Sequence, residues 1–333
     1  MRLVLKIVGV LAVCLVVIAA GGYSYLLLAY PKVGDAPVLK AEASPERIAR
    51  GKYLADHVAV CTDCHSQRDW SRYAGPIKPD TYGAGGEVWD ETVGFPGRLV
   101  ARNITPANLA SWSDGEIVRA FTEGVSRDGT PLFPLMPYTS YGKFMAREDA
   151  LAIVAYLRTI PSRSQQIADR RLHFPLPLIV RTMPTPAATT TARPDPSDPV
   201  AYGRYLVNIA GCADCHTPTD ARKAPLPDMR LAGGQEFPLP NGLIARSANL
   251  TSDATTGLGG WSEDQFIEKF KAYADGTPHV PVTTRDFNTP MPWQSYSGMT
   301  RDDLAAIFAY LKTVPAIRHQ VEKVGRQAAA TNE

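Results

Sequence analysis

The chain has 333 residues and an almost balanced charge, with 35 Lys and Arg residues against 33 Asp and Glu residues. Two of the basic residues, Arg2 and Lys6, stand at the N-terminus, so the rest of the chain carries as many acidic as basic side chains. Without a basic surplus, the chain is not expected to bind nucleic acid. Its length predicts two domains of ordinary size after an N-terminal segment.

An uncharged, largely apolar run extends from Ile7 to Tyr30. About 20 apolar residues suffice to cross the hydrocarbon core of a bilayer as a helix. A cleaved signal peptide also combines a positive start with an apolar run, but this run is longer than usual and no small-X-small cleavage site ends it. We therefore predict an uncleaved transmembrane anchor at 1–30, followed by a linker at 31–46.

The charges beside the anchor predict its orientation. Positively charged residues next to a membrane helix stay on the cytoplasmic side. Arg2 and Lys6 therefore place the N-terminus inside and export everything after Pro31. We predict a single-pass protein of the bacterial cytoplasmic membrane with its body in the periplasm.

A helix at 47–58, begun by Ser44-Pro45-Glu46, leads into the motif Cys61-Thr62-Asp63-Cys64-His65. The motif recurs as Cys212-Ala213-Asp214-Cys215-His216 after a helix begun by Asp198-Pro199. Two thiols one helical turn apart can add to the two vinyl groups of a haem, and the adjacent His can bind the iron. A dithiol redox pair or half of a zinc site needs no His at that place. We predict two covalently bound haem c groups, one on Cys61 and Cys64 and one on Cys212 and Cys215, with His65 and His216 as iron ligands.

Further helices follow each motif. The capping boxes Ser113–Glu116 and Ser262–Gln265 predict middle helices at 116–122 and 265–272. Closing helices are predicted at 147–159 and 300–313. A helix running into the haem motif, a middle helix and a closing helix are the layout of a small all-helical cytochrome c domain.

The second axial ligand determines the chemistry of a haem. A Met sulfur opposite the His gives a six-coordinate electron carrier, whereas an open position permits ligand or peroxide chemistry. A Met-Pro-aromatic triplet precedes each closing helix, and we predict Met136 and Met291 as the second iron ligands. Met145 and Met299 also match between the copies and are the alternative. Both stand just before a helix, where an apolar side chain usually packs as a hydrophobic staple.

The motifs belong to two copies of one sequence unit. Gly51-Lys52-Tyr53-Leu54 matches Gly203-Arg204-Tyr205-Leu206, and Asn103-Ile104-Thr105 matches Asn249-Leu250-Thr251. We predict an all-α fold class: a transmembrane helix followed by two tandem class I cytochrome c-like domains at 47–162 and 200–316. The segment between them, 163–199, is rich in Pro, which predicts an extended, semi-rigid linker, and 317–333 is a tail.

The remaining chemistry-bearing residues are predicted to have supporting roles. Four histidines lack a counterpart in the other copy and are expected to be surface or hydrogen-bonding residues: His57, His173, His279 and His319. The matched Trp112 and Trp261 are expected at a haem wall or in the core. The pairs Gly85-Gly86 and Gly233-Gly234 are expected to form turns that cross the haem edge.

At this level of detail the chain resembles a known family. Its haem motifs, Asn-Ile-Thr-Pro from Asn103, Trp-Ser-Asp-Gly-Glu-Ile from Trp112, Met-Pro-Tyr from Met136 and the closing Ala-Tyr-Leu-Arg from Ala155 resemble the multihaem cytochrome c subunits of membrane-bound alcohol and aldehyde dehydrogenases. The resemblance implies an electron conduit between a dehydrogenase and quinone or a respiratory oxidase. Those subunits usually carry three haem motifs, whereas this chain has two and an N-terminal apolar segment.

The sequence thus predicts a membrane-anchored dihaem c-type cytochrome. It would pass single electrons between a periplasmic dehydrogenase or quinol and a downstream respiratory acceptor. It would have no catalytic residues and would not be an enzyme by itself. A dihaem peroxidase-like enzyme is one alternative, and it would need one haem with a displaceable ligand. A haem subunit of a terminal oxidase complex is the other, and it differs in partner rather than in chemistry.

Overall fold

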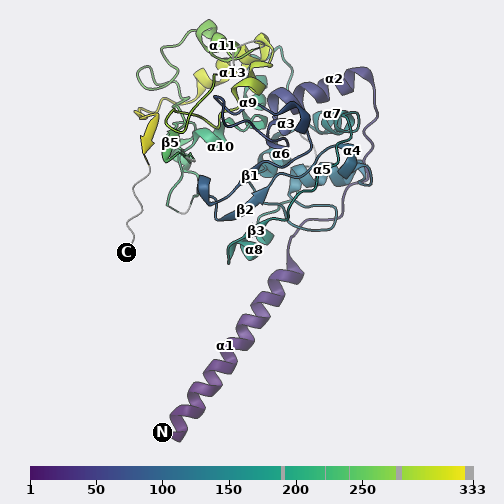
Figure 1. Ribbon diagram of the computed structural model, residues 1–333, viewed down its shortest axis with the longest axis vertical. Helices are drawn as coiled ribbons and strands as arrows, with labels where there is room; N and C mark the ends of the chain where they lie inside the picture. The colour runs from purple at the N-terminus through teal and green to yellow at the C-terminus, as the bar shows by residue number, and fades with distance from the viewer. Residues whose placement is uncertain (189–191, 222, 240, 275–279, 327–333) are drawn as a thin grey trace.

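The computed structural model describes residues 1–188, 192–221, 223–239, 241–274 and 280–326. A long helix, α1 (Arg2–Ala29), projects from a body that contains all the other elements (Figure 1). None of its residues is buried, and by length and composition it could cross a membrane. A signal sequence would meet the same criterion of length and composition.

The first half of the body is built around α2 and α7. Gly51 allows these helices to cross closely, because a Cβ atom there would lie 1.8 Å from the carbonyl oxygen of Ala152. The middle helix α5 packs against both α6 and α7. The helical elements of this half are α2 (Pro45–Tyr53), the π-helical turn η1 (Leu54–Val58), α3 (Cys61–Cys64), η2 (Pro79–Thr81), η3 (Glu91–Val93), α4 (Pro106–Leu109), α5 (Asp114–Glu123), α6 (Tyr138–Phe144) and α7 (Arg147–Leu157).

The second half repeats this arrangement. Here α9 packs against α13, and Gly203 takes the place of Gly51, since its Cβ would lie 1.8 Å from the carbonyl oxygen of Ala306. Buried side chains of both halves join in one hydrophobic core. The helical elements of this half are α9 (Pro199–Ile209), α10 (Cys212–His216), η5 (Pro227–Met229), α11 (Glu263–Lys271), α12 (Trp293–Ser297) and α13 (Arg301–Thr313).

The predicted helix starts are confirmed by their caps. The side chains of Ser44, Asp198 and Thr300 each accept a hydrogen bond from a backbone N–H of the first turn. Ser113 and Ser262 form complete capping boxes with Glu116 and Gln265. These local signals mark the starts of the helices that precede the two haem motifs, of both middle helices and of the second closing helix.

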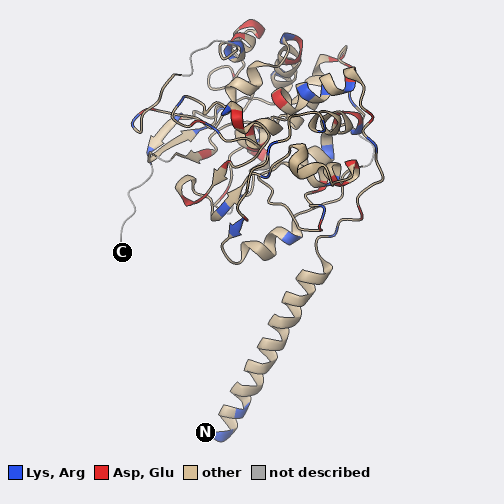
Figure 2. Cartoon of the chain, turned by 45° about the vertical axis from the view of Figure 1, so that its right-hand side comes forward, with Lys and Arg blue, Asp and Glu red and all other residues tan. Residues whose placement is uncertain are grey.

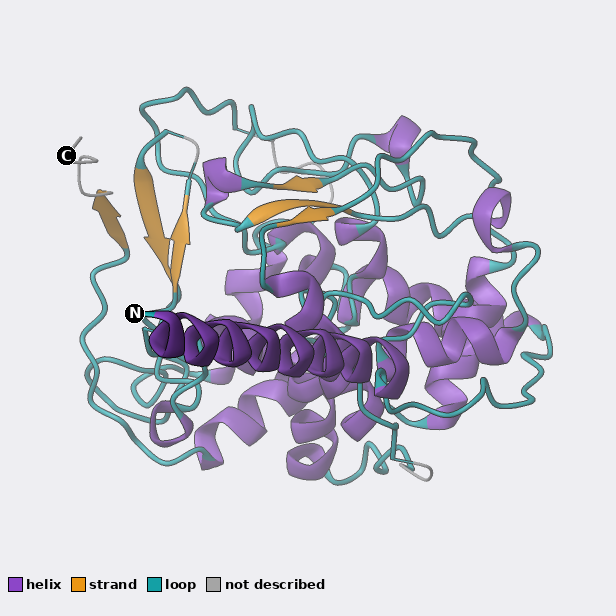
Figure 3. Cartoon of the chain, turned by 90° about the horizontal axis from the view of Figure 1, so that it is seen from below, coloured by secondary structure: helices purple, strands orange, loops and turns teal. Residues whose placement is uncertain are grey.

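The all-helical class is not confirmed, because the described residues include two three-stranded antiparallel sheets. In Figure 3 the two sets of strands lie along one side of the body and most helices lie on the other. Each sheet consists of a hairpin from the loop after a haem motif and a third strand that follows the closing helix. Val88 pairs with Val100 and Gly97 with Leu172 in one sheet, and Phe237 pairs with Ala245 in the other. The strands are β1 (Val88–Trp89), β2 (Gly97–Val100), β3 (Arg171–Leu172), β4 (Glu236–Pro238), β5 (Leu243–Arg246) and β6 (Val324–Arg326).

The linker prediction needs a correction. The Pro-rich segment contains two short helices, α8 (Leu176–Ile179) and η4 (Val180–Thr182), and is not extended throughout. Proline is compatible with the first turn of a helix because the N–H it lacks there has no intrahelical partner. Pro175 is the N-cap of α8 and Pro177 lies in its first turn. The segment is therefore extended only in part.

Candidate haem sites

Both haem motifs occupy a short helix that follows a left-handed residue. Val60 (φ 44°) precedes α3 and Gly211 (φ 67°) precedes α10, and each turns the chain sharply away from the preceding long helix. The four motif cysteines are free thiols. Desolvation raises the pKa of the Cys61 and Cys212 thiols to about 12, so both are uncharged at neutral pH.

Each motif histidine is oriented by a backbone carbonyl. His65 Nδ1 lies 2.6 Å from the carbonyl oxygen of Arg102, and His216 Nδ1 lies 2.7 Å from that of Ala248. A carbonyl can only accept, so Nδ1 carries the proton and Nε2 keeps its lone pair. Desolvation also lowers the pKa of both rings, which favours the neutral form. Both imidazoles are thus prepared to bind a metal through Nε2.

The two carbonyl groups are held in place by a repeated Asn-X-Thr turn. The Asn103 side-chain oxygen accepts from the Thr105 backbone N–H at 2.8 Å and from its hydroxyl at 2.7 Å. Asn249 and Thr251 form the same turn, with distances of 2.9 and 2.7 Å. The amide groups of both asparagines donate to carbonyl oxygens of the segments after the closing helices, those of Arg163 and Ile317.

Sequence reasoning noted the Asn-X-Thr repeat but assigned it no role. The repeat directly follows Arg102 and Ala248 in the sequence, and this position could have indicated that it supports the two carbonyl groups.

The paired glycines do form turns, as predicted, with positive φ angles at all four positions. The Gly85 N–H donates to the carbonyl oxygen of His65 and that of Gly233 to the carbonyl oxygen of His216, each at 2.8 Å. The backbone therefore holds each histidine from two sides.

Met136 and Met291 lie in matching loops. Each is half-buried, and its carbonyl oxygen accepts from the backbone N–H two residues later, that of Tyr138 at 2.7 Å and that of Trp293 at 2.8 Å. The helices that follow them, α6 and α12, are tied to the turn before the haem motif of the same half. Tyr141 and Tyr296 make these contacts by donating to the carbonyl oxygens of Ala59 and Ala210.

The alternative methionines have a different environment. Met145 and Met299 are 5% and 2% exposed and belong to the hydrophobic core. Each directly precedes the N-cap of a closing helix, as the staple interpretation predicts. Packing in the hydrophobic core therefore explains the positions of the Met145 and Met299 side chains. Met136 and Met291 remain the predicted iron ligands.

The two motifs are connected by reciprocal contacts between the halves. Ser295 of α12 donates to Asp63 of the first motif at 3.2 Å, and Ser140 of α6 donates to Asp214 of the second motif at 3.5 Å. Desolvation raises the pKa of both carboxyl groups. Each methionine-bearing loop thus leads into a helix that touches the haem motif of the other half. In Figure 1, α3 and α10 accordingly lie toward the middle of the body.

The loop after the first motif makes further contacts with the second half. The Tyr73 N–H donates to the Val280 carbonyl oxygen and the Ala74 N–H to the Asn288 side chain, both at 2.8 Å. Arg68 reaches the carbonyl oxygen of Pro290, the residue before Met291, at 3.5 Å. The first half therefore supports the loop that carries the second predicted methionine ligand.

The unmatched histidines that the structure describes have hydrogen-bond or ion-pair partners, and the two matched tryptophans differ in their exposure. His57 lies 2.9 Å from the Ser295 carbonyl oxygen, His173 pairs with Glu91 at 3.2 Å, and His319 lies 2.9 Å from the Ala232 carbonyl oxygen. His279 lies outside the described residues. Trp112 packs against the core, whereas Trp261 is 38% exposed.

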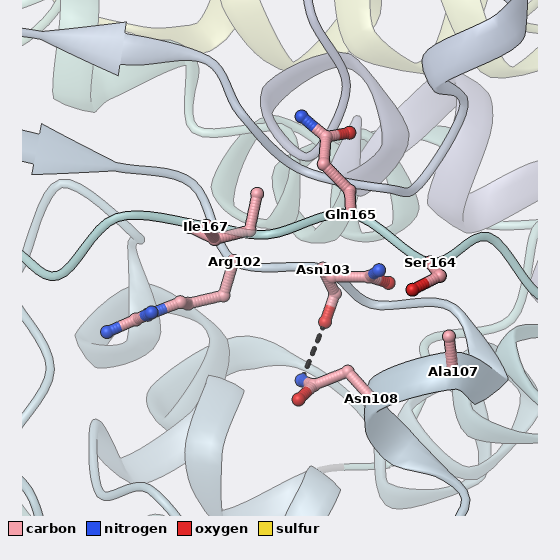
Figure 4. Close-up of a pocket in the computed structure, with 7 residues that line it drawn as sticks. All are labelled: Arg102, Asn103, Ala107, Asn108, Ser164, Gln165 and Ile167. Carbon is pink, nitrogen blue, oxygen red and sulfur yellow. Dashed lines mark hydrogen bonds between the residues drawn. The ribbon is translucent and has the colours of Figure 1, made fainter.

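A polar cavity of about 220 Å³ is lined by Arg102 and by the asparagine turn that follows it. It is bounded by the Asn-X-Thr turn and by the segment after α7, and Asn108 spans one side by donating to the Asn103 carbonyl oxygen at 2.8 Å (Figure 4). Arg102, whose carbonyl oxygen accepts from His65, lines the cavity. The cavity therefore shares Arg102 and Asn103 with the turn that orients His65.

The residues present fit a covalently bound haem. Each half offers two free thiols one turn apart and an imidazole whose Nδ1 is already paired. A thioether-linked haem requires this donor set. Cys61, Cys64 and His65 would hold one group, and Cys212, Cys215 and His216 would hold the other.

Comparison with known proteins agrees with this geometry. Residues 200–315 match the family model described as cytochrome c. The second half therefore contains a cytochrome c domain, and this family implies covalently bound haem c.

The chain also has relatives along most of its length. It is 28% identical over 302 residues to "Alcohol dehydrogenase (quinone), cytochrome c subunit" of Gluconacetobacter polyoxogenes, which covers 85% of this chain and 59% of that protein. It is 29% identical to "Gluconate 2-dehydrogenase cytochrome c subunit" of Pantoea cypripedii, covering 88% and 65% of the two chains. The chain thus spans less than two thirds of the length of these relatives.

A third relative is closer to this chain in length. "Diheme cytochrome c-type" of Cereibacter sphaeroides is 28% identical, covering 77% of this chain and 82% of that protein. The resemblance drawn from the motifs is confirmed by these relatives. The first two are by name cytochrome subunits of dehydrogenases, that is, electron-transfer components and not the catalytic enzymes themselves.

Proposed function

We propose that this chain is a membrane-anchored dihaem c-type cytochrome that transfers single electrons. Its donor would be a periplasmic dehydrogenase or a quinol, and its acceptor a downstream respiratory component. The chain would be held in the bacterial cytoplasmic membrane by residues 1–30, with two tandem cytochrome c domains in the periplasm. The domain boundaries are those predicted from the repeat, 47–162 and 200–316.

The observation that carries this proposal is the duplicated histidine frame. In each half a Cys-X-X-Cys-His helix presents an imidazole that a backbone carbonyl holds through Nδ1. Each half also places a methionine in a loop whose following helix is hydrogen-bonded to the turn before the motif. Bound haem would supply a one-electron iron couple, and its potential would depend on axial ligation, burial and hydrogen bonding.

The contacts between the halves support transfer within one molecule. Ser140 and Ser295 connect each half to the haem motif of the other, so the two motifs are positioned by direct packing as well as by the linker. Similarity to subunits named for alcohol and gluconate dehydrogenases supports a dehydrogenase as the partner. A near-neutral body favours docking to a fixed membrane partner over strong electrostatic capture of a mobile one.

Rapid reduction of the purified full chain tests the proposal. Mixing with a quinol, or with an isolated dehydrogenase subunit, should reduce both haems without a lasting ligand-free intermediate. The reduced protein should not bind carbon monoxide, because both irons would keep their methionines. Turnover of hydrogen peroxide, or of an alcohol by this chain alone, would contradict the electron-carrier assignment and favour an enzyme.

A further inference from the structure

The C-terminal end of α1 is fastened to the segment between the two halves. The last carbonyl groups of a helix have no intrahelical partners. Arg181, in η4, donates to the carbonyl oxygens of Leu26 at 3.3 Å, Leu27 at 2.8 Å and Tyr30 at 2.6 Å. A cation at this end is also favourable for the helix dipole. The position of residues 174–182 is therefore set relative to the end of the apolar helix.

This segment exposes apolar side chains at that position. Residues 174–180 contain no charged residue. Phe174 is 80% exposed and Ile179 is 42% exposed, while Val180 is fully buried. Leu28, in the last turn of α1, is 88% exposed. Exposed apolar residues thus continue from the helix onto α8, which lies at the lower edge of the body beside the end of α1 (Figure 1).

Polar and aromatic residues next to this surface are those typical of a membrane interface. Tyr25 and Tyr30 stand near the end of α1 with ring centroids 6.2 Å apart, and Lys32 lies over the Tyr30 ring. Tyrosines are enriched where a helix leaves the hydrocarbon core. Arg98 and Arg171 are exposed and directly opposite in the β2–β3 pair. Like charges in this arrangement repel unless an anion lies between them.

Figure 2 shows Lys and Arg residues on β3 and in the α8–η4 region, on the side of the body from which α1 emerges. We propose that residues 174–182 form a second membrane contact, in which Phe174 and Ile179 enter the boundary between headgroups and acyl chains. Arg98 and Arg171 would meet the headgroup phosphates. This inference rests on the membrane anchoring proposed above, and the occupant of the surface is the bilayer itself.

The consequence is a defined orientation of the haem domains. A single helix followed by a flexible linker would let the body rotate and tilt above the membrane. Two membrane contacts, one through α1 and one through the α8 region, restrict that motion. The strength of an interfacial contact of this kind increases with the apolar area that it buries. Both haem motifs would then keep a constant height and direction relative to partners in the same membrane.

Spin labels on the full, haem-loaded chain in nanodiscs containing anionic lipid test this contact. In a Cys14→Ser background, labels are attached to Phe174→Cys and Ile179→Cys. Val200→Cys is the matched control, because Val200 is 40% exposed but lies on α9, in the upper part of the body in Figure 1. The collision rates of each label with oxygen, which concentrates in lipid, and with a water-soluble nickel complex are then measured.

We expect the ratio of oxygen to nickel collisions to be several-fold higher at positions 174 and 179 than at position 200. Equal ratios at all three positions would overturn the inference. Labels at 174 and 179 that are shielded from both reagents would also overturn it, because a protein partner would then cover the surface. A label at Leu15→Cys separates the two hypotheses. If only that label reports lipid, the anchor stands and the second contact fails; if it reports water, both fail.

Discussion

Arg102 and Ala248 have different side chains and the same role. Each contributes its carbonyl oxygen to a histidine 37 or 32 residues away in sequence, and each is held by the Asn-X-Thr turn that follows it. The cysteines, histidines and methionines of both sites could be proposed from the sequence, because their side chains themselves carry the chemistry of haem attachment and iron ligation. The carbonyl partners could not be named in advance, because any residue has the same backbone oxygen.

The methionine assignment gives the first prediction. Met136→Ala and Met291→Ala should each abolish about half of the methionine-to-iron charge-transfer absorbance, since each removes one of two proposed ligands. Absorbance of the oxidised protein measures this change. Met145→Ala and Met299→Ala are the matched controls, and they should lower stability while leaving the band, because both side chains are core residues. Loss of the band in these controls instead would show that the ligand assignment is wrong.

Glu87 predicts a pH dependence. Its carboxylate accepts from Trp70 Nε1 at 2.7 Å and from the Arg68 N–H at 2.9 Å, and desolvation raises its pKa above the ordinary value of 4.5. The folded state therefore binds this proton more tightly than the unfolded state. The resulting cost to stability appears as pH rises above the unfolded pKa and is absent at lower pH.

Glu87→Gln removes this titration. The free energy of unfolding of the variant, relative to the unchanged protein, should therefore increase from about pH 4 to about pH 7. Denaturant titrations at both pH values measure the difference. The exposed Glu322→Gln is the control and should show no such trend. A Glu87→Gln difference that stays constant with pH would exclude the desolvated carboxylate as its source.

At the scale of elements, local signals predicted the helices before the haem motifs, the middle helices and the closing helices, but not the short helices α6 and α12 or any strand. A capping box is contained in four consecutive residues, so Ser113 and Ser262 could be read directly as helix starts. Strands β3 and β6 depend on pairing with β2 and β5 across long stretches of sequence. Two or three residues carry no periodicity of their own that would indicate a strand.

The caps provide a prediction at this scale. Ser113→Ala and Ser262→Ala should each lower the free energy of unfolding by about 1 kcal/mol, because each removes the acceptor for an N–H of the first helical turn. Thermal or denaturant unfolding measures the loss. The exposed Ser162→Ala is the control and should have little effect. If the cap variants are as stable as that control, the capping boxes do not stabilise α5 and α11 in solution.

At the scale of the whole molecule, the two halves exchange matching contacts. Tyr53 donates to Asp303 at the start of α13, and Tyr205 donates to Asp149 at the start of α7. Each tyrosine hydroxyl also accepts a backbone N–H of the other half, that of Thr300 or of Ala146. The repeat in the sequence predicts two similar units. It does not predict that each unit completes the other, because such contacts depend on how the copies pack.

The two carboxylates differ in their other partners, and this difference gives the last prediction. Asp149 is 1% exposed and also accepts from Arg50 at 2.7 Å and from Arg193 at 3.1 Å. Among the described residues, Asp303 has no second side-chain donor besides Tyr53. Tyr53→Phe therefore leaves a largely buried carboxylate unpaired, whereas Tyr205→Phe leaves one that two guanidinium groups still neutralise. An unpaired buried charge costs more than a lost hydrogen bond to a paired one.

Tyr53→Phe should accordingly lower the free energy of unfolding by about 2 kcal/mol or more, and Tyr205→Phe by less. Denaturant unfolding of the haem-loaded chain in detergent, followed by haem absorbance, measures both. Tyr310→Phe is the control, because its hydroxyl meets Arg230 of the same half. Equal losses for Tyr53→Phe and Tyr205→Phe would show that the two arginines do not compensate Asp149. No loss in either variant would mean that the reciprocal contacts do not hold the halves together.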